Sequence, residues 1–132
     1  MKKWGRFELV TLLGKGGMGE VHKAYDPNLR RFIALKILRY EDSEVLQRFL
    51  RESHAQAQVE HMHVCKIYES GEYNGHPYIA MQYIEGETLN EVSNDLNLEE
   101  KIKIMKEVSL GLHAAHRQGL IHRDVKPANI MI

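Results

Sequence analysis

Three side chains near the end of the sequence are of types that could act together in catalysis. Within the segment His122–Asn129, Asp124 supplies a carboxylate, Lys126 an ammonium group and Asn129 an amide. A phosphoryl-transfer site needs such groups beside the hydroxyl that receives the phosphate. The spacing His-Arg-Asp-x-x-x-x-Asn therefore indicates chemistry of that kind.

A glycine-rich segment near the start of the sequence could approach phosphates. Residues Gly14–Val21 follow the pattern Gly-x-Gly-x-x-Gly-x-Val, and glycines let a backbone come close to a polyanion and aim its N–H groups at it. The same spacing opens a helix in dinucleotide-binding folds, but here β-branched Val21 and a strand-like pattern follow. We therefore favour a hairpin over phosphates, with an ordinary glycine-rich turn as the plain alternative.

Lys36 lies in an apolar strand-like segment, Ile33–Lys36, where an unpaired ammonium group would be costly to bury. It should therefore have an anionic partner, and Glu52 on the following helix is the residue we expect. Glu44 is the alternative, although it lies near the expected start of that helix. A solvated lysine and an unrelated surface glutamate are the commoner fate of either residue alone.

The elements that position these residues change type along the chain. Strand-like patterns dominate before Gly86, interrupted by one helix that Asp42 or Ser43 could cap. Helical spacing dominates afterwards, with Asn97 and Glu100 as a capping box. We expect an α+β fold with strands near residues 7–13, 21–25, 31–38, 64–69 and 78–83, a helix from about 43 to 59, and a second helix from 97 towards Gly119.

Composition narrows the class of protein. A chain of 132 residues with 43% apolar residues suits one modest domain. The 18 basic and 18 acidic side chains cancel, so we expect no nucleic-acid partner. No apolar stretch approaches the roughly 20 residues that span a bilayer, and the single Cys65 suits a reducing compartment. We expect a cytoplasmic chain, although a longer parent protein could be membrane-anchored.

A group of histidines around Cys65 raises the question of zinc. His61, His63 and Cys65 alternate and would share one face of a strand, with His54 nearby. Their spacing matches no standard closed zinc site, which needs four well-placed ligands. We therefore interpret these residues as structural.

The three motifs occur in an order that resembles the first half of a protein kinase domain. The glycine-rich segment, the strand lysine with its helix glutamate, and the His122–Asn129 segment are most similar to those of bacterial eukaryotic-type serine/threonine kinases. The resemblance covers nearly the whole chain. It implies a complete kinase N-lobe at residues 1–84, with an antiparallel sheet and one main helix, and the beginning of a helical C-lobe at 85–132.

The resemblance also implies roles and ligands. Asp124 would be the catalytic base, Lys126 would steady the γ-phosphate, and Asn129 would bind Mg²⁺. ATP would be the phosphate donor and a protein Ser or Thr hydroxyl the acceptor. The residues expected to bind ATP are Leu13, Gly14, Gly16, Gly17, Gly19, Val21, Ala34, Lys36, Glu52, Gln82, Ile84 and Met131.

Two departures from the family pattern modify these expectations. Gln56 stands one turn after Glu52, where kinases usually carry an apolar group, and could loosen the helix. The chain ends at Ile132, before the Asp-Phe-Gly segment that supplies a further Mg²⁺ ligand. We therefore expect little kinase activity from these 132 residues alone. The alternative is a non-catalytic nucleotide-binding pseudokinase or regulatory module.

Overall fold

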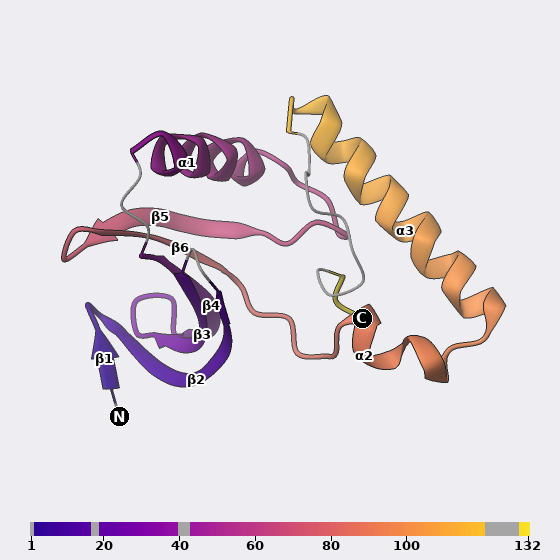
Figure 1. Ribbon diagram of the computed structural model, residues 1–132, viewed down its shortest axis with the longest axis horizontal. Coiled ribbons are helices and arrows are strands. Elements are labelled where there is room, and N and C mark those ends of the chain that lie inside the picture. The colour runs from indigo at the N-terminus through magenta and orange to yellow at the C-terminus, as the bar shows by residue number, and fades with distance from the viewer. Residues whose placement is uncertain (1, 17–18, 40–42, 121–129) are drawn as a thin grey trace. The chain divides into compact units, whose positions relative to one another are not determined.

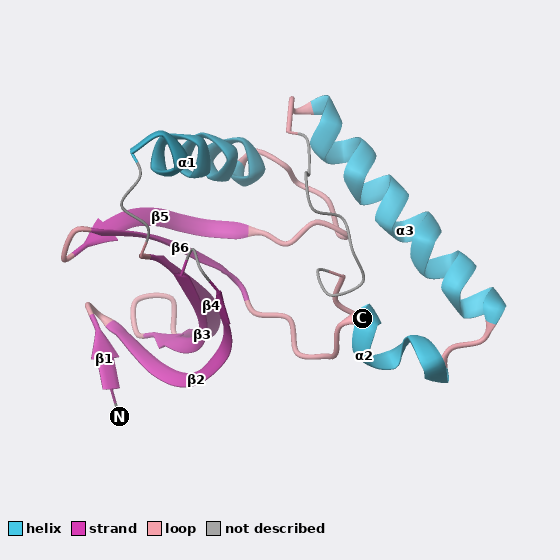
Figure 2. Cartoon of the chain, viewed as in Figure 1, coloured by secondary structure: helices cyan, strands magenta, loops and turns pink. Residues whose placement is uncertain are grey.

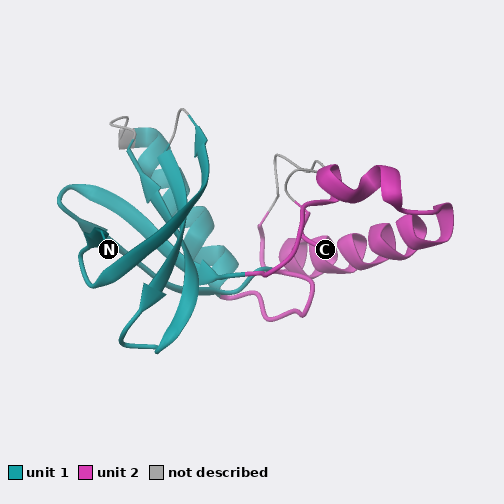
Figure 3. Ribbon diagram, turned by 90° about the horizontal axis from the view of Figure 1, so that it is seen from below, with its two compact units in different colours: residues 1–57, 65–83 teal, residues 58–64, 84–132 magenta. Residues whose placement is uncertain are grey.

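The computed structural model describes residues 2–16, 19–39, 43–120 and 130–132. The chain divides into two compact units (Figure 3). The first unit comprises Met1–Ala57 and Cys65–Tyr83, and the second comprises Gln58–Val64 and Ile84–Ile132. The predicted α+β class is confirmed, since a curled antiparallel sheet is combined with helices (Figure 2).

The first unit is built on a six-stranded antiparallel sheet with the order β1-β2-β3-β4-β6-β5. Its central strand β4 is the apolar segment that sequence analysis predicted, and Ile33, Leu35 and Ile37 are fully buried in it. They join Trp4, Phe7, Ala24 and Ala80 in one core cluster. The strands are β1 (Lys2–Trp4), β2 (Phe7–Gly16), β3 (Gly19–Asp26), β4 (Arg31–Leu38), β5 (Ile67–Tyr73) and β6 (His76–Gln82).

The hairpin between β5 and β6 differs from its predicted bounds. The sequence predicted strands near residues 64–69 and 78–83, but β5 continues to Tyr73, which pairs directly with His76. Asn74 and Gly75 both have positive φ, 51° and 77°. An Asn-Gly pair in that conformation makes a two-residue hairpin turn whose twist matches the strands, so both strands extend up to it.

Helix α1 (Ser43–Ala57) packs against β5 (Figure 1). Val45, Leu46 and Phe49 are half-buried at helical spacing, as the apolar pattern predicted, whereas Leu50 is exposed. The helix ends two residues earlier than the predicted end at Val59. Glu52 and Gln56 lie one turn apart on α1, so their side chains project from the same side of the helix.

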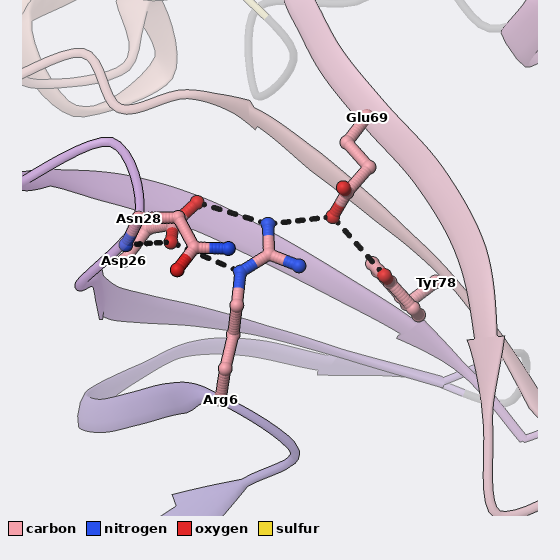
Figure 4. Close-up of polar contacts among 5 residues, drawn as sticks. All are labelled: Arg6, Asp26, Asn28, Glu69 and Tyr78. Carbon is pink, nitrogen blue, oxygen red and sulfur yellow. Dashed lines mark hydrogen bonds and ion pairs between the residues drawn. The ribbon is translucent and has the colours of Figure 1, made fainter.

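A partly buried ion cluster connects the two edges of the curled sheet (Figure 4). Arg6, between β1 and β2, donates to both carboxylate oxygens of Asp26 at 3.1 Å and to Glu69 of β5 at 2.7 Å. Tyr78 of β6 donates to the same Glu69 at 3.1 Å. Burial opposes the ionisation of Asp26, but hydrogen bonds from Arg6 and from the Asn28 backbone outweigh it and keep the pKa of Asp26 below its usual value.

The second unit is helical. Thr88 caps the short helix α2 (Leu89–Val92), a 3₁₀ turn η1 follows at Ser93–Asp95, and α3 extends over Leu98–Arg117. Asn97 and Glu100 form the predicted capping box at the start of α3. Gly119, with φ of 79°, follows the end of the helix as expected. No helix among the described residues is long and apolar enough to cross a membrane.

The last described residues, 130–132, also belong to this unit. Leu89 donates its backbone N–H to the Ile130 carbonyl at 2.7 Å, and Ile132 donates to the Glu87 carbonyl at 2.8 Å. These two bonds flank an isolated antiparallel bridge between Thr88 and Met131. The segment that follows residue 129 is therefore fixed beside the start of α2.

Candidate functional site

The glycine-rich segment forms the tip of the β2–β3 hairpin. Gly16 pairs with Gly19, and Gly14 pairs with Val21. A strand follows Gly19 directly, so the helix that a dinucleotide-binding fold would require at this point is replaced by β3. Gly17 lies outside the described residues.

Gly19 is a position that only glycine can occupy. Its φ is 155°, and a Cβ atom there would lie 2.0 Å from the Ile37 carbonyl oxygen of β4. The backbone of the hairpin thus lies directly on the strand that carries Lys36. Gly14 and Gly16 differ, because an added Cβ would meet nothing within 4 Å at either position. These two glycines leave open space beside the hairpin backbone.

The strand register brings several predicted site residues onto one face of the sheet. Val21 of β3 lies opposite Lys36 of β4, and Lys36 lies opposite Ile79 of β6. Ala34 lies two residues from Lys36 and opposite Met81. Residues that face each other on adjacent strands, and residues two apart on one strand, share a face. This face therefore combines small and apolar side chains with two lysines, Lys36 of β4 and Lys23 of β3, which lies opposite Ala34.

Lys36 is half-buried, and its Nζ lies 5.4 Å from the centre of the Phe49 ring of α1. Burial lowers the pKa of Lys36, and the attraction of Glu52 opposes that shift without cancelling it. Glu52, the partner expected from the sequence, thus acts on Lys36 through electrostatic attraction alone. The two side chains do not form a direct ion pair in the structure, although both lie in its described part. Burial therefore removes water from the ammonium group, and the attraction of Glu52 offsets only part of the resulting cost.

Three of the remaining residues predicted to bind ATP lie at the end of β6 or beyond it, and the fourth lies in β2. Gln82 is the last residue of β6 and belongs to the first unit. Ile84 and Met131 belong to the second unit. Leu13 lies at an irregularity in the β2–β3 pairing, between Leu12 and Gly14.

Comparison with known proteins decides the family. Residues 7–132 match the model of the protein kinase domain. The chain belongs to the protein kinase family. It is 43% identical to the probable serine/threonine-protein kinase PknB of Bifidobacterium longum and 37% identical to the serine/threonine-protein kinase PrkC of Bacillus subtilis. Each match covers 97% of this chain and 21% of the relative, so the chain spans about a fifth of the length of these kinases.

A solved kinase structure agrees with this assignment. The crystal structure of the Mycobacterium tuberculosis PknI kinase domain superimposes with a TM-score of 0.85 at 33% identity. The match covers 99% of this chain and 57% of that domain. The curled sheet with its helix thus has the fold of a protein kinase N-lobe, followed by the start of a C-lobe.

The expected catalytic residues Asp124, Lys126 and Asn129 lie outside the described residues. The helix that leads to them is described, and Leu120 donates its N–H to the Ala115 carbonyl at 3.1 Å where that helix ends. The roles of these three residues in this kinase chain stay predictions from the family pattern.

Sequence analysis missed a charged cluster beside the glycine-rich hairpin. Glu20 of β3 accepts a hydrogen bond from Nε of Arg39, just after β4, and pairs with Nε2 of His22 at 2.9 Å. The hydrogen bond with His22 is the main cause that lowers the pKa of Glu20. Glu20 and His22 lie two residues apart on one strand and therefore share a face, which was the signal available in the sequence.

The histidines considered for zinc make local contacts. The backbone N–H of His63 donates to Nδ1 of His61 at 3.0 Å. In the described part of the chain, no group of three or more His, Cys, Asp or Glu side chains could hold a metal ion. The Cys65 thiol instead donates to the Gln82 carbonyl.

Proposed function

We propose that this chain binds ATP, and that the kinase to which it belongs transfers the γ-phosphoryl group to Ser or Thr hydroxyls of proteins. The observation that carries the proposal is the environment of Lys36. Its ammonium group is half-buried, its pKa is lowered by burial, and it makes no ion pair with a carboxylate of the described residues. A desolvated cation gains most from an anionic ligand, and a phosphate oxygen is such a ligand.

The glycine-rich hairpin supports the same proposal. Gly14 and Gly16 leave space in which a phosphate could approach the backbone. Gly19 lets β3 lie against β4, so that Val21 stands opposite Lys36. A group held by the hairpin backbone would therefore be bound close to the lysine of the neighbouring strand.

The apolar residues of this face suit a flat aromatic base. Val21 and Ala34 present small side chains on the same face as Lys36, and burying an adenine ring against them removes apolar surface from water. The backbone of Gln82, at the end of the neighbouring strand, would then be the polar edge that recognises the base.

The transfer step itself rests on family resemblance. Asp124 would accept the hydroxyl proton of the substrate, and Lys126 would hold the transferred phosphate. Asn129 is the expected ligand of Mg²⁺, which in kinases offsets the charge of the phosphates. Asn129 lies outside the described residues.

Isothermal titration calorimetry with Mg²⁺ and ATP tests the proposal. We expect the unmutated chain to bind ATP and Lys36→Met to weaken binding at least tenfold, because one charge-assisted contact is lost. Lys103→Met, a matched change at an exposed lysine of α3, should leave the affinity unchanged. Equal weakening by both variants, or no binding by the unmutated chain, would contradict nucleotide binding at Lys36.

A phosphorylation assay separates the kinase from the alternative of a non-catalytic module. In the longer kinase to which this chain is proposed to belong, transfer of labelled phosphate that Asp124→Asn abolishes would support a kinase, whereas ATP binding without transfer there would support the module. The expectation that these 132 residues alone transfer little phosphate stays a prediction.

A further inference from the structure

Gln56 makes a contact that its position in the kinase pattern did not suggest. Its side-chain Nε2 donates a hydrogen bond to the Cys65 carbonyl, at 3.1 Å. Cys65 lies in the connection that leads from α1 to β5. The polar side chain therefore links the last turn of α1 to the following segment. Sequence analysis had instead expected Gln56 to loosen the helix.

The same connection is bonded to Gln82 at the end of β6. The Cys65 thiol donates to the Gln82 carbonyl, with the sulfur 3.4 Å from the oxygen. Burial raises the pKa of Cys65, so the thiol keeps its proton at neutral pH and can act as a donor. The Lys66 backbone N–H donates to Oε1 of Gln82 at 3.3 Å, and the Gln82 N–H donates to the Lys66 carbonyl at 2.7 Å.

These contacts form a continuous path within the first unit, from the helix to the strand end. We propose that the Gln56–Gln82 link, made of Gln56, Cys65, Lys66 and Gln82, couples the position of α1 to the carbonyl of Gln82 and so sets the preference for adenine. Gln56 is then a positioning residue. This inference rests on the proposed function, in which the Gln82 backbone recognises the base.

Two features explain how the link would act on a nucleotide. Glu52 precedes Gln56 by one helical turn, so fixing that turn also fixes the carboxylate whose attraction opposes the pKa shift of Lys36. A carbonyl oxygen has two lone pairs. The Cys65 thiol engages the Gln82 carbonyl from one side and orients it, while a second donor, such as the adenine amino group, can still bind.

Amide hydrogen exchange of the full chain without nucleotide tests the link itself. Gln56→Met keeps the side-chain length but removes the amide donor, and Gln47→Met makes the same change at an exposed position of α1. We expect Gln56→Met to speed exchange about fivefold in the last turn of α1 and at the Gln82 N–H, the effect of losing one hydrogen bond. Gln47→Met should change neither. Faster exchange confined to α1, or none, would overturn the link.

Cys65 provides a second pair of variants if Gln56→Met fails to fold. Cys65→Ala removes the donor to the Gln82 carbonyl, whereas Cys65→Ser keeps a hydroxyl donor. We expect faster exchange at both ends of the link for Cys65→Ala and near-normal exchange for Cys65→Ser. Equal exchange in the two variants would contradict a donor role for Cys65.

The consequence for recognition is tested with ATP and inosine triphosphate, which carries an oxygen in place of the adenine amino group. Gln56→Met should lower the preference for ATP over inosine triphosphate about threefold, and Gln47→Met should leave it unchanged. A purely structural role of Gln56 would weaken both nucleotides equally and overturn the positioning role. If the unmutated chain binds neither nucleotide, the proposed function fails, and hydrogen exchange alone decides whether the link exists.

Discussion

At the scale of single residues, Gly19 shows how closely the glycine-rich hairpin depends on one backbone position. Its φ of 155° and the Ile37 carbonyl oxygen, 2.0 Å from an added Cβ, together exclude a side chain. Gly19→Ala should therefore lower the free energy of unfolding by more than about 2 kcal/mol. Gly14→Ala, with open space around its Cβ, is the matched control. Chemical denaturation checks both, and equal stability of the two variants would refute the argument.

Asp26 gives a second prediction at this scale. Its side chain is fully buried and accepts two hydrogen bonds from Arg6, whose side chain is 30% exposed. Asp26→Asn should lower the free energy of unfolding by about 3 kcal/mol, which is near the lower end of the cost of breaking a buried ion pair. The cost is at the lower end because Arg6 retains its hydrogen bond to Glu69 and some contact with solvent. Urea unfolding at neutral pH measures this cost, and Glu72→Gln, at an exposed residue of β5, is the control.

The same carboxylate predicts a dependence on pH. The folded pKa of Asp26 is lowered, so its contribution to stability is present above the unfolded value of about 4 and is lost as pH falls through the folded pKa. The unmutated chain should lose stability over this acidic range, and Asp26→Asn should lose less. Parallel pH profiles for the two proteins would contradict the prediction.

Residue types alone predicted part of the candidate site. The apolar strand-like run predicted β4 and placed Lys36 on it, and the glycine spacing predicted a hairpin. The Arg6–Asp26–Glu69 cluster was not foreseen, because it joins residues up to 63 positions apart. The absence of a direct Lys36–Glu52 ion pair could not be foreseen either, since it depends on how far α1 stands from β4.

At the scale of elements, local signals were the most reliable. The capping box at Asn97 fixed the start of α3, because it needs only residues three apart. The Asn-Gly turn at residues 74 and 75 was an equally local signal, and neglecting it misplaced the ends of β5 and β6. Strand bounds elsewhere depend on pairing with distant strands, which sequence patterns do not record.

Helix α3 carries an apolar stripe, as the helical spacing predicted, and its solvent-facing part yields a further test. The exposed side chains Leu98, Ile102 and Met105 lie at helical spacing, with exposures of 73%, 61% and 47%. An exposed apolar stripe binds hydrophobic dyes, so the 132-residue chain should enhance the fluorescence of anilinonaphthalene sulfonate.

Two variants test whether the dye binds to the apolar stripe of α3 or to other exposed apolar side chains. Ile102→Lys should reduce dye binding with little change in stability, because the side chain is already exposed. Leu29→Lys, which changes an exposed apolar residue in the turn between β3 and β4, should leave most dye binding in place. Equal loss of dye binding in both variants would contradict a role for the stripe.

At the scale of the whole molecule, the kinase family assignment rests on a match that spans residues 7–132. The glycine-rich hairpin, the lysine strand and the helix with Glu52 all lie in one compact unit. The nucleotide contacts proposed for Val21, Ala34 and Lys36 therefore require only the internal order of that unit. Binding of a nucleotide to these three residues can therefore be measured with the 132-residue chain.

Nuclear magnetic resonance of the Lys36 side chain, with and without Mg²⁺ and ATP, tests the central claim most directly. Without ligand, burial should keep the pKa of Lys36 below the usual lysine value. Phosphates favour the charged ammonium group, so ATP should shift the Lys36 signal and raise its pKa, with Lys103 as an unaffected internal reference. An unchanged Lys36 signal and pKa at saturating ATP would contradict nucleotide binding at this lysine.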